Sequence, residues 1–291
     1  MSILDIWTLI VQLRVEETDV NKIALITGGS SGIGEAAARE LKRRGFTVYA
    51  AARRVDHMKP LEADGIHILP LDVTDETSIQ KCVQTILAQE GRIDVLVNNA
   101  GYGSYGAVED VPIEEAKRQF EVNLFGLARL TQLVLPLMRE NQSGKIVNIT
   151  SIGGKIYTPF GAWYHATKHA LEGWSDSLRM ELAPFNIDVV IVEPGGIKTP
   201  WGKIAVDNLR ETSGSGPYAP AVAKAADGMT KLYAGNRLTD PSVIATTIAR
   251  AVTAARPRTR YSAGYMAKSA LFMRWLLPDR LFDRMIVSMA A

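Results

Sequence analysis

Short apolar segments alternate with helical patterns over most of this chain, from residue 22 to about residue 261. Strands are predicted at residues 22–27, 47–52, 66–71, 93–97, 145–150 and 187–192, and helices at residues 33–44, 76–90, 113–141 and 162–183. Strands that are almost wholly apolar and are separated by helices are typical of a parallel sheet covered on both faces. The sequence therefore predicts an α/β fold built on a doubly wound parallel sheet.

Composition narrows the classes of protein that remain. The 291 residues are 47% hydrophobic and 22% charged, with a net charge of +2, so bulk charge does not argue for a nucleic-acid partner. Cys82 is the sole cysteine, which excludes an internal disulfide and favours a reducing, cytoplasmic setting. The N-terminus lacks the basic region of a secretory signal, and no apolar run approaches the roughly twenty residues of a membrane-spanning helix.

Three parts of the chain are distinguished by pattern. Residues 1–20 form an apolar extension that is predicted to be an amphipathic helix, and residues 21–265 form the catalytic domain. Within that domain, residues 200–240 stand where a lid over the substrate is expected, and they contain a flexible, polar stretch at residues 213–217. Residues 266–291 form a tail in which basic and apolar side chains alternate, interrupted at Pro278.

The tail admits two interpretations. It covers the substrate entrance or packs against a second subunit, or it lies on an anionic membrane surface as a peripheral contact. The break at Pro278 favours packing against protein.

A glycine-rich turn separates the first predicted strand from the first helix. Gly28, Gly32 and Gly34 permit a tight turn and let the backbone approach a pyrophosphate, and the helix N-terminus supplies unpaired N–H groups. A glycine-rich turn without a ligand is the alternative, but the strand before it and the helix after it are the context that a Rossmann-like dinucleotide site requires.

The end of the second strand bears on cofactor choice. An acidic residue there would bind the ribose 2′-hydroxyl of NAD, but the chain has Ala52 followed by Arg53 and Arg54. Guanidinium groups pair well with phosphate, so NADP(H) is predicted over NAD(H), which remains possible. Ser30 and Ser31 would add hydroxyl donors to the same phosphate; the alternative is that the arginines belong to a solvated loop.

Tyr164 and Lys168 lie one helical turn apart, and Ser151 precedes Tyr164 by thirteen residues. A nearby ammonium would favour the phenolate of a tyrosine, whose ordinary pKa is about 10. A hydride arriving at a carbonyl carbon creates an alkoxide that needs a proton and hydrogen-bond donors, which Tyr164 and Ser151 would supply. His165 and His169 have a spacing that zinc uses, but no further ligands accompany them, so a structural role is favoured and no metal is predicted.

Six motifs resemble those of the short-chain dehydrogenase/reductase family and follow one another along the chain in the same order, over roughly residues 20–200. They are Thr27 to Gly34, Asn98-Asn99-Ala100-Gly101, Asn123, Ser151, Tyr164-x-x-x-Lys168 and Pro194 to Thr199. The resemblance implies one domain with a seven-stranded parallel sheet and a last strand around residues 258–262. The stretch from Asn98 to Thr199 and the tail look most like the hydroxysteroid and retinol dehydrogenase branch.

The resemblance also implies roles for individual residues. Tyr164 would be the acid or base, Ser151 would bind the substrate oxygen and Asn123 would position a water. Lys168 would bind the nicotinamide ribose and lower the pKa of Tyr164. The cofactor would be bound by Gly28, Ser30, Ser31, Gly32, Ile33, Gly34, Arg53, Arg54, Asp72, Asn99, Ala100, Gly101, Tyr164, Lys168, Pro194, Gly195, Ile197 and Thr199.

These features predict an NADP(H)-dependent oxidoreductase for a carbonyl or secondary alcohol, and the branch makes a lipophilic substrate the expectation. Aromatic residues expected near the site are Tyr102, Tyr105, Trp163, Trp201 and Tyr218, although core packing explains Trp163 equally well. The alternative function is a non-catalytic NADPH-binding sensor or interaction protein. A homo-oligomer through the helices at 113–141 and 162–183 is expected from the family.

Overall fold

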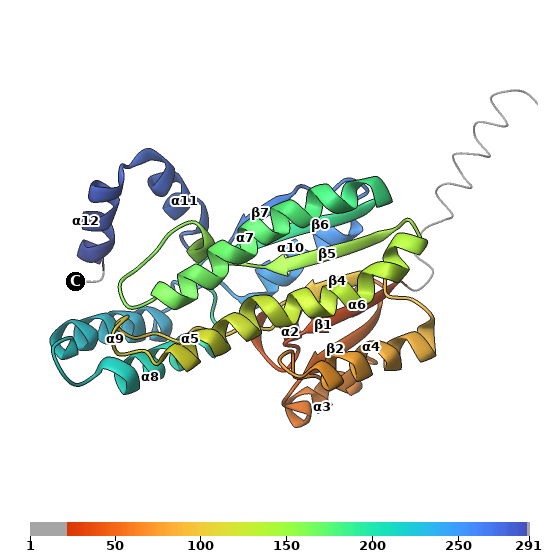
Figure 1. Ribbon diagram of the computed structural model, residues 1–291, viewed down its shortest axis with the longest axis horizontal. Coiled ribbons are helices and arrows are strands. Elements are labelled where there is room, and N and C mark those ends of the chain that lie inside the picture. The colour runs from red at the N-terminus through yellow and green to blue at the C-terminus, as the bar shows by residue number, and fades with distance from the viewer. Residues whose placement is uncertain (1–21, 290–291) are drawn as a thin grey trace, which may run out of the picture.

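The computed structural model describes residues 22–289, so the extension predicted at residues 1–20 lies outside the described part. Seven parallel strands form one sheet in the order β3-β2-β1-β4-β5-β6-β7 (Figure 1). The strands are β1 (Ile23–Thr27), β2 (Thr47–Ala52), β3 (His67–Pro70), β4 (Val95–Asn98), β5 (Gly144–Ile149), β6 (Ile187–Pro194) and β7 (Arg260–Ala263). The predicted doubly wound sheet is confirmed, including the seventh strand implied by the family resemblance.

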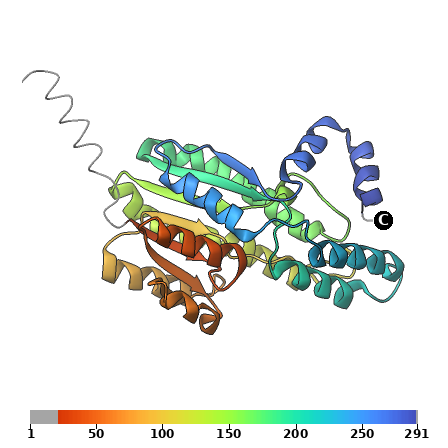
Figure 2. The same cartoon turned by 180° about the vertical axis from the view of Figure 1, so that it is seen from behind.

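The helices cover both faces of this sheet. They are α2 (Gly32–Arg43), α3 (Lys59–Glu62), α4 (Glu76–Glu90), α5 (Ile113–Phe120), α6 (Gly126–Glu140), α7 (Ala162–Leu182), α8 (Trp201–Ser213), α9 (Ala219–Ala234), α10 (Pro241–Thr253), α11 (Ala267–Leu276) and α12 (Asp279–Met289). Helices α2 and α10 enclose one core with the sheet, and α4, α6 and α7 enclose the other (Figures 1 and 2). Two apolar layers therefore hold the five inner strands rigidly between them, which fixes the positions of the loops at the ends of those strands.

The helix predicted at 113–141 contains a local irregularity. A π-helical segment, η2 (Glu121–Phe125), lies between α5 and α6, and Pro136 lies inside α6. π-Helical segments inside α-helices are frequent at functional sites. Asn123, which the sequence placed in the catalytic set, lies within this segment.

The region in which the sequence places a lid is mostly helical. Helices α8 and α9 make up most of residues 200–240, the predicted flexible stretch at residues 213–217 lies at the turn between them, and residues 235–240 are non-helical. Leu209, Val222 and Ala226 are buried between these helices, and this apolar contact stabilises a helical hairpin that the composition of the turn does not reveal. The break predicted at Pro278 is confirmed, since it separates α11 from α12.

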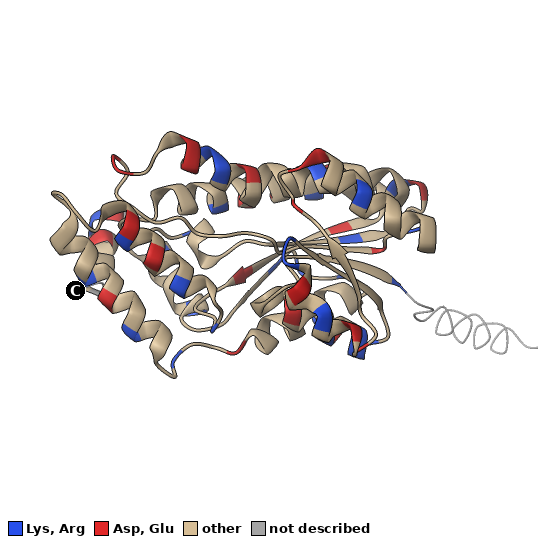
Figure 3. Cartoon of the chain, turned by 90° about the horizontal axis from the view of Figure 1, so that it is seen from below, with Lys and Arg blue, Asp and Glu red and all other residues tan. Residues whose placement is uncertain are grey.

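Both helical pairs, α8–α9 and α11–α12, lie beyond the carboxyl ends of the strands, at the end of the molecule opposite β1's N-terminus (Figures 1 and 2). Crevices at the carboxyl ends of parallel strands are the usual ligand sites of such sheets. Acidic and basic residues are interspersed along the helices (Figure 3), in keeping with the small net charge. No helix in residues 22–289 is long and apolar enough to cross a membrane.

Candidate active site

The glycine-rich turn between β1 and α2 adopts the close backbone packing that the sequence predicts. Gly28 and Gly32 have φ values of +69° and +60°, which L side chains rarely adopt. A Cβ on Gly34 would lie 2.3 Å from the carbonyl oxygen of Gly28, so α2 begins as close to β1 as two backbones allow. The N-terminus of α2 therefore faces the crevice with its free N–H groups, and the turn fits a diphosphate.

Thr27 fixes the second loop of this crevice. Its hydroxyl oxygen accepts hydrogen bonds from the backbone N–H groups of Asn99 (3.0 Å) and Ala100 (2.9 Å). The amide of Asn99 in turn donates to the backbone oxygen of Thr27 at 2.9 Å. The loops after β1 and β4 are thereby joined at the point where the strand order reverses. Thr27 begins the first motif but was not assigned a role from sequence.

Two arginines line the adenosine end of the crevice in different places. The Nη2 of Arg54 lies 3.3 Å from the hydroxyl of Ser30 and 3.4 Å from that of Ser31, so one cation and two hydroxyl groups converge. Arg53 instead lies near Asp72. Burial would raise the pKa of Asp72, but hydrogen bonds from the N–H and hydroxyl of Thr74, with the charge of Arg53, hold it below its usual value. The donor cluster around Arg54 fits a phosphate, and the ionised Asp72 fits a hydrogen-bond donor such as an adenine amino group.

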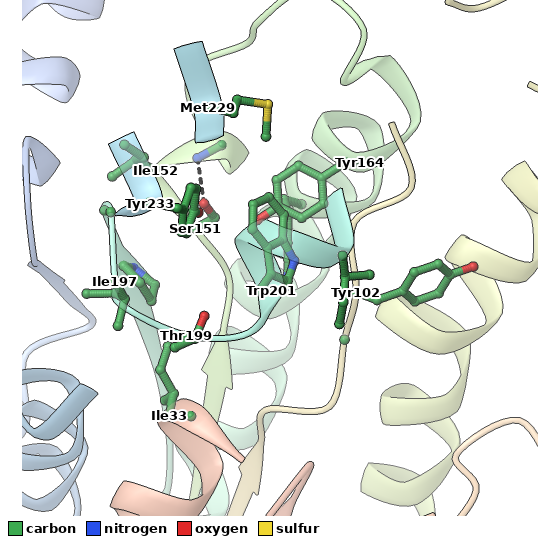
Figure 4. A pocket seen from close by; sticks show the side chains of 18 of the residues that line it. Ile33, Tyr102, Ser151, Ile152, Tyr164, Ile197, Thr199, Trp201, Met229 and Tyr233 are labelled. Carbon is green, nitrogen blue, oxygen red and sulfur yellow. Dashed lines mark hydrogen bonds between the residues drawn. The ribbon is translucent and has the colours of Figure 1, made fainter. Parts of the chain in front are cut away.

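Tyr164, Lys168 and Ser151 meet at the end of β5. Tyr164 and Lys168 both project from α7 and are buried, 8% and 7% exposed, and Ser151 lies directly after the strand. The Nζ of Lys168 donates to the backbone oxygen of Ile149 at 2.9 Å. Ser151 accepts a hydrogen bond from Gly153 N–H at 2.9 Å, shown as the dashed line in Figure 4, which leaves its own proton free to donate.

The electrostatics of this group differ from the sequence expectation. Burial raises the pKa of Tyr164 to about 12, and the hydrogen bond from Ser151 opposes that rise without reversing it. Burial also lowers the pKa of Lys168 to about 8, against the charge of Glu172. In the chain alone, desolvation therefore holds the pKa of Tyr164 above its ordinary value, and the predicted lowering by Lys168 is not seen. Tyr164 is a protonated phenol at neutral pH.

Asn123 holds a central position in the polar network behind these residues. It is fully buried, its Oδ1 accepts from the N–H of Tyr102 at 3.0 Å, and its Nδ2 donates to the oxygen of Tyr102 (2.9 Å) and to Thr167 (3.1 Å). A Cβ on Gly101 would lie 3.1 Å from Asn123 Oδ1 and 3.8 Å from Lys168 Nζ. Asn123 therefore joins α7 to the loop after β4, and its predicted role with water stays a prediction.

His165 braces the segment that carries Ser151. Its Nδ1 lies 2.9 Å from the oxygen of Gly153 and its Nε2 accepts from the N–H of Thr158 at 3.0 Å, so the ring is bonded at both nitrogens. Burial lowers its pKa, which keeps the imidazole neutral. No group of three metal-ligating side chains occurs in the described part of the chain. His165 thus holds the start and end of the loop between β5 and α7 in place.

One cavity of about 1410 Å³ joins the cofactor crevice to the reacting group. Tyr105 and Trp201 line it, with ring centroids 5.8 Å and 5.2 Å from that of Tyr164, which confirms two of the predicted aromatic residues. Trp163 and Tyr218 do not line it: the indole N–H of Trp163 is buried in the protein, and Tyr218 packs on Phe160.

Some cavity residues differ from or escape the sequence prediction. Tyr102 lines the cavity, but its ring points away from it (Figure 4) and its hydroxyl donates to Glu115 at 2.9 Å. Tyr233 and Met229 of α9 do face the site and were missed. They lie in a segment with no motif, and only the folding of α8–α9 over the site brings them there.

The segment after β6 closes the cavity on the nicotinamide side of the predicted cofactor site. Ile197 and Thr199 lie near Ile33 (Figure 4), and a Cβ on Gly32 would touch the Cγ2 of Thr199 at 3.0 Å. Of the 18 residues predicted to bind cofactor, 17 line this one cavity, and Gly34 lies behind the turn against the backbone of Gly28. Among the four predicted catalytic residues, Ser151, Tyr164 and Lys168 line it, and Asn123 lies behind it through its contacts with Tyr102.

Comparison with known proteins decides the family. The model of the short chain dehydrogenase family matches residues 22–209. The chain belongs to that family. It is therefore an NAD(P)-dependent oxidoreductase that acts on CH–OH or carbonyl groups.

Individual relatives agree with this assignment. The chain is 34% identical to an NADPH-dependent 3-dehydrocapnine reductase of Ornithobacterium rhinotracheale, over 90% of this chain and 95% of that one. It is 43% identical to a 3-ketodihydrosphingosine reductase of Bacteroides thetaiotaomicron, over 61% of this chain and 65% of that one. A short-chain dehydrogenase from Streptomyces avermitilis has a similar crystal structure, with a TM-score of 0.76 and 37% identity over 88% of this chain and 93% of that one.

Proposed function

We propose that this short-chain dehydrogenase is an NADP(H)-dependent oxidoreductase that works on a lipophilic ketone or the matching secondary alcohol, and that its residues favour reduction. The observation that carries the proposal is the position of Tyr164 beside Ser151, in a largely apolar cavity that continues into the dinucleotide crevice. The names of two relatives, a 3-ketodihydrosphingosine reductase and an NADPH-dependent 3-dehydrocapnine reductase, support both the direction and the cofactor.

The cofactor, when bound, supplies or accepts the hydride. The residues of the chain do the remaining work: Ser151 donates a hydrogen bond to the carbonyl oxygen and so holds it near Tyr164. As negative charge develops on that oxygen, Tyr164 gives up its proton, for which a pKa of about 12 makes it a suitable acid toward an alkoxide. The charge of Lys168 stabilises the phenolate that remains. The apolar walls exclude water and strengthen these contacts.

The preference for NADP(H) rests on the donor cluster of Arg54, Ser30 and Ser31 and on the absence of an acidic residue at Ala52. A guanidinium and two hydroxyl groups at one point are suited to a phosphate monoester, whereas a ribose 2′-hydroxyl would have no carboxylate acceptor there. The predicted homo-oligomer, the cytoplasmic location and a peripheral membrane contact through the tail stay predictions.

The test compares the parent protein with Tyr164→Phe. NADPH oxidation, followed by absorbance, is expected with lipophilic ketones in the parent, and a loss of roughly 10²–10⁴-fold in the variant. The dissociation constant of NADPH, measured by fluorescence titration, is expected to change only a few-fold, because the phenol acts on the substrate oxygen. Tight NADPH binding without turnover of any ketone or aldehyde would instead favour the alternative of a cofactor sensor.

A further inference from the structure

We infer that the substrate carries an unbranched alkyl chain, and that the helical pair α11–α12 forms the wall of the chamber that receives this chain and selects its length. The inference rests on the proposed function, since it takes the reacting carbon to lie at Ser151 and Tyr164. It concerns the part of the cavity that lies away from the cofactor crevice, which we call the tail chamber.

The tail chamber has walls from three parts of the chain. Ala270 and Met273 of α11, with Phe282, Met285 and Ile286 of α12, line the cavity on one side. Ile152 and Ile156, directly after Ser151, line it as well. On the opposite side the same cavity is lined by Ile204 of α8 and by Met229 and Leu232 of α9. The apolar surface therefore begins at the reacting group and extends away from it between the two helical pairs.

Contacts to the loop between β5 and α7 hold the α11–α12 pair in place. Phe282 is fully buried and packs edge-on against Tyr157, with ring centroids 5.5 Å apart. The hydroxyl of Tyr157 donates to Asp283 at 2.9 Å. Arg274 lies over both rings, at 5.6 Å and 5.4 Å, and pairs with Asp279 at 2.9 Å. Because this loop also carries Ser151, the far wall of the chamber is fixed relative to the reacting group.

The chemistry of the walls indicates a hydrocarbon. The residues of α11 and α12 that line the cavity are Ser269, Ala270, Met273, Phe282, Met285 and Ile286, and only Ser269 among them is polar. The hydroxyl of Ser269 donates to the oxygen of Met266. The polar residues Lys224, Asp227, Lys231, Asn236 and Arg237 line the cavity at and after α9. A ligand that extends along α11 and α12 therefore meets apolar side chains, and a polar group placed there would lose its hydrogen bonds to water without gaining others.

The shape of the walls favours a flexible chain over a rigid ring. Met229, Met273 and Met285 line the chamber, and methionine side chains adapt to the contour of a bound ligand. The whole cavity, about 1410 Å³, exceeds the roughly 300–1,000 Å³ of a pocket for one small ligand, so it has room for a second apolar group beside a dinucleotide.

The experiment measures kcat/KM with NADPH for methyl ketones from butanone to hexadecanone, each below its solubility limit. We expect kcat/KM to rise by about threefold to fourfold per methylene group, the factor that corresponds to about 0.8 kcal/mol, and then to level off when the chamber is full. Equal values for butanone and dodecanone would overturn the inference and leave the proposed function standing. If NADPH reduces no ketone at all, the proposed function itself fails.

Two variants narrow the chamber, and one matched variant does not. Met285→Trp and Met273→Trp are expected to lower kcat/KM for dodecanone at least tenfold and to leave butanone within twofold. Val287→Trp places the same ring on the exposed side of α12, where Val287 is 57% exposed, and is expected to leave both within twofold. If Met285→Trp also loses activity toward butanone, the variant is damaged in general, and Met273→Trp then tests the inference. An unchanged dependence of kcat/KM on chain length in both variants would overturn the inference.

A measurement of ligand binding tests the tail chamber without requiring catalysis. cis-Parinaric acid, an unbranched polyene chain, is expected to fluoresce when it enters the chamber of the full-length protein and to be displaced by dodecanone but not by butanone. Met285→Trp should weaken its binding at least fivefold, and Val287→Trp should not. Equal binding to the parent and Met285→Trp would show that the probe lies elsewhere and that α12 does not form the wall.

Discussion

Replacing Arg54 with alanine should weaken the binding of NADPH and so remove much of the predicted preference for NADPH over NADH. The guanidinium of Arg54 lies 3.3–3.4 Å from the hydroxyl groups of Ser30 and Ser31, so a 2′-phosphate at this point would receive one charged and two neutral donors. A hydrogen bond to a charged group contributes about 1.5–3 kcal/mol, which corresponds to about tenfold to 150-fold in a dissociation constant. Arg54 is exposed, so we expect the lower end, about tenfold to thirtyfold weaker NADPH binding.

NADH is the internal control because it lacks the phosphate. Fluorescence titration of both cofactors should show that Arg54→Ala weakens NADPH and leaves NADH within twofold, and that Arg54→Lys has an intermediate effect because lysine keeps the charge but not the planar fork. Arg53→Ala distinguishes the roles of the two arginines, since Arg53 lies on the side of Asp72. We expect Arg53→Ala to weaken NADPH binding less than Arg54→Ala does. Equal binding of NADPH and NADH by the parent, or an equal loss of both in Arg54→Ala, would refute the reasoning.

Three further predictions concern the crevice and the reacting group. Lys168→Ala should lower turnover and also weaken NADPH binding, because Lys168 is predicted to contact the nicotinamide ribose. Tyr164→Phe should lower turnover alone. Steady-state kinetics and fluorescence titration of both variants check this, and an unchanged NADPH affinity in Lys168→Ala would contradict it. Lys168 is charged below its pKa of about 8 and neutral above it, so kcat/KM for reduction should fall as pH rises through 8. Since the charge of Glu172 raises that pKa, Glu172→Gln should move the fall to lower pH, and a pH–rate profile that does not move would show that another group titrates. Gly34→Ala places a Cβ 2.3 Å from the oxygen of Gly28 and should abolish NADPH binding and destabilise the fold by about 1–3 kcal/mol, measured by urea unfolding. The matched control Gly173→Ala meets nothing within 4 Å in α7 and should be neutral or stabilising by up to about 1 kcal/mol.

Local sequence determined the sheet and the cofactor crevice because both depend on short-range patterns. The five inner strands of the sheet, β2, β1, β4, β5 and β6, are largely buried, so they are visible as apolar runs, whereas β7 was expected only from the family resemblance. Gly28, Gly32 and Gly34 are required by backbone geometry within a single turn. Ser151, Tyr164 and Lys168 were found for the same reason, since their spacing places them on one strand end and one helix face.

Only the tertiary structure decided the electrostatics and the chamber. The spacing predicts that Lys168 and Tyr164 share one face of a helix, but the pKa of the phenol depends on how deeply both groups are buried, which no spacing reveals. The helices on either side of the flexible stretch at residues 213–217 carry no motif, and they form a pair because apolar residues such as Leu209 and Val222 pack together. Tyr157 and Phe282 are 125 residues apart in the sequence, and their contact fixes the tail over the reacting group. Such long-range contacts carry no local signal, since their free energy is gained only after the sheet has positioned both partners.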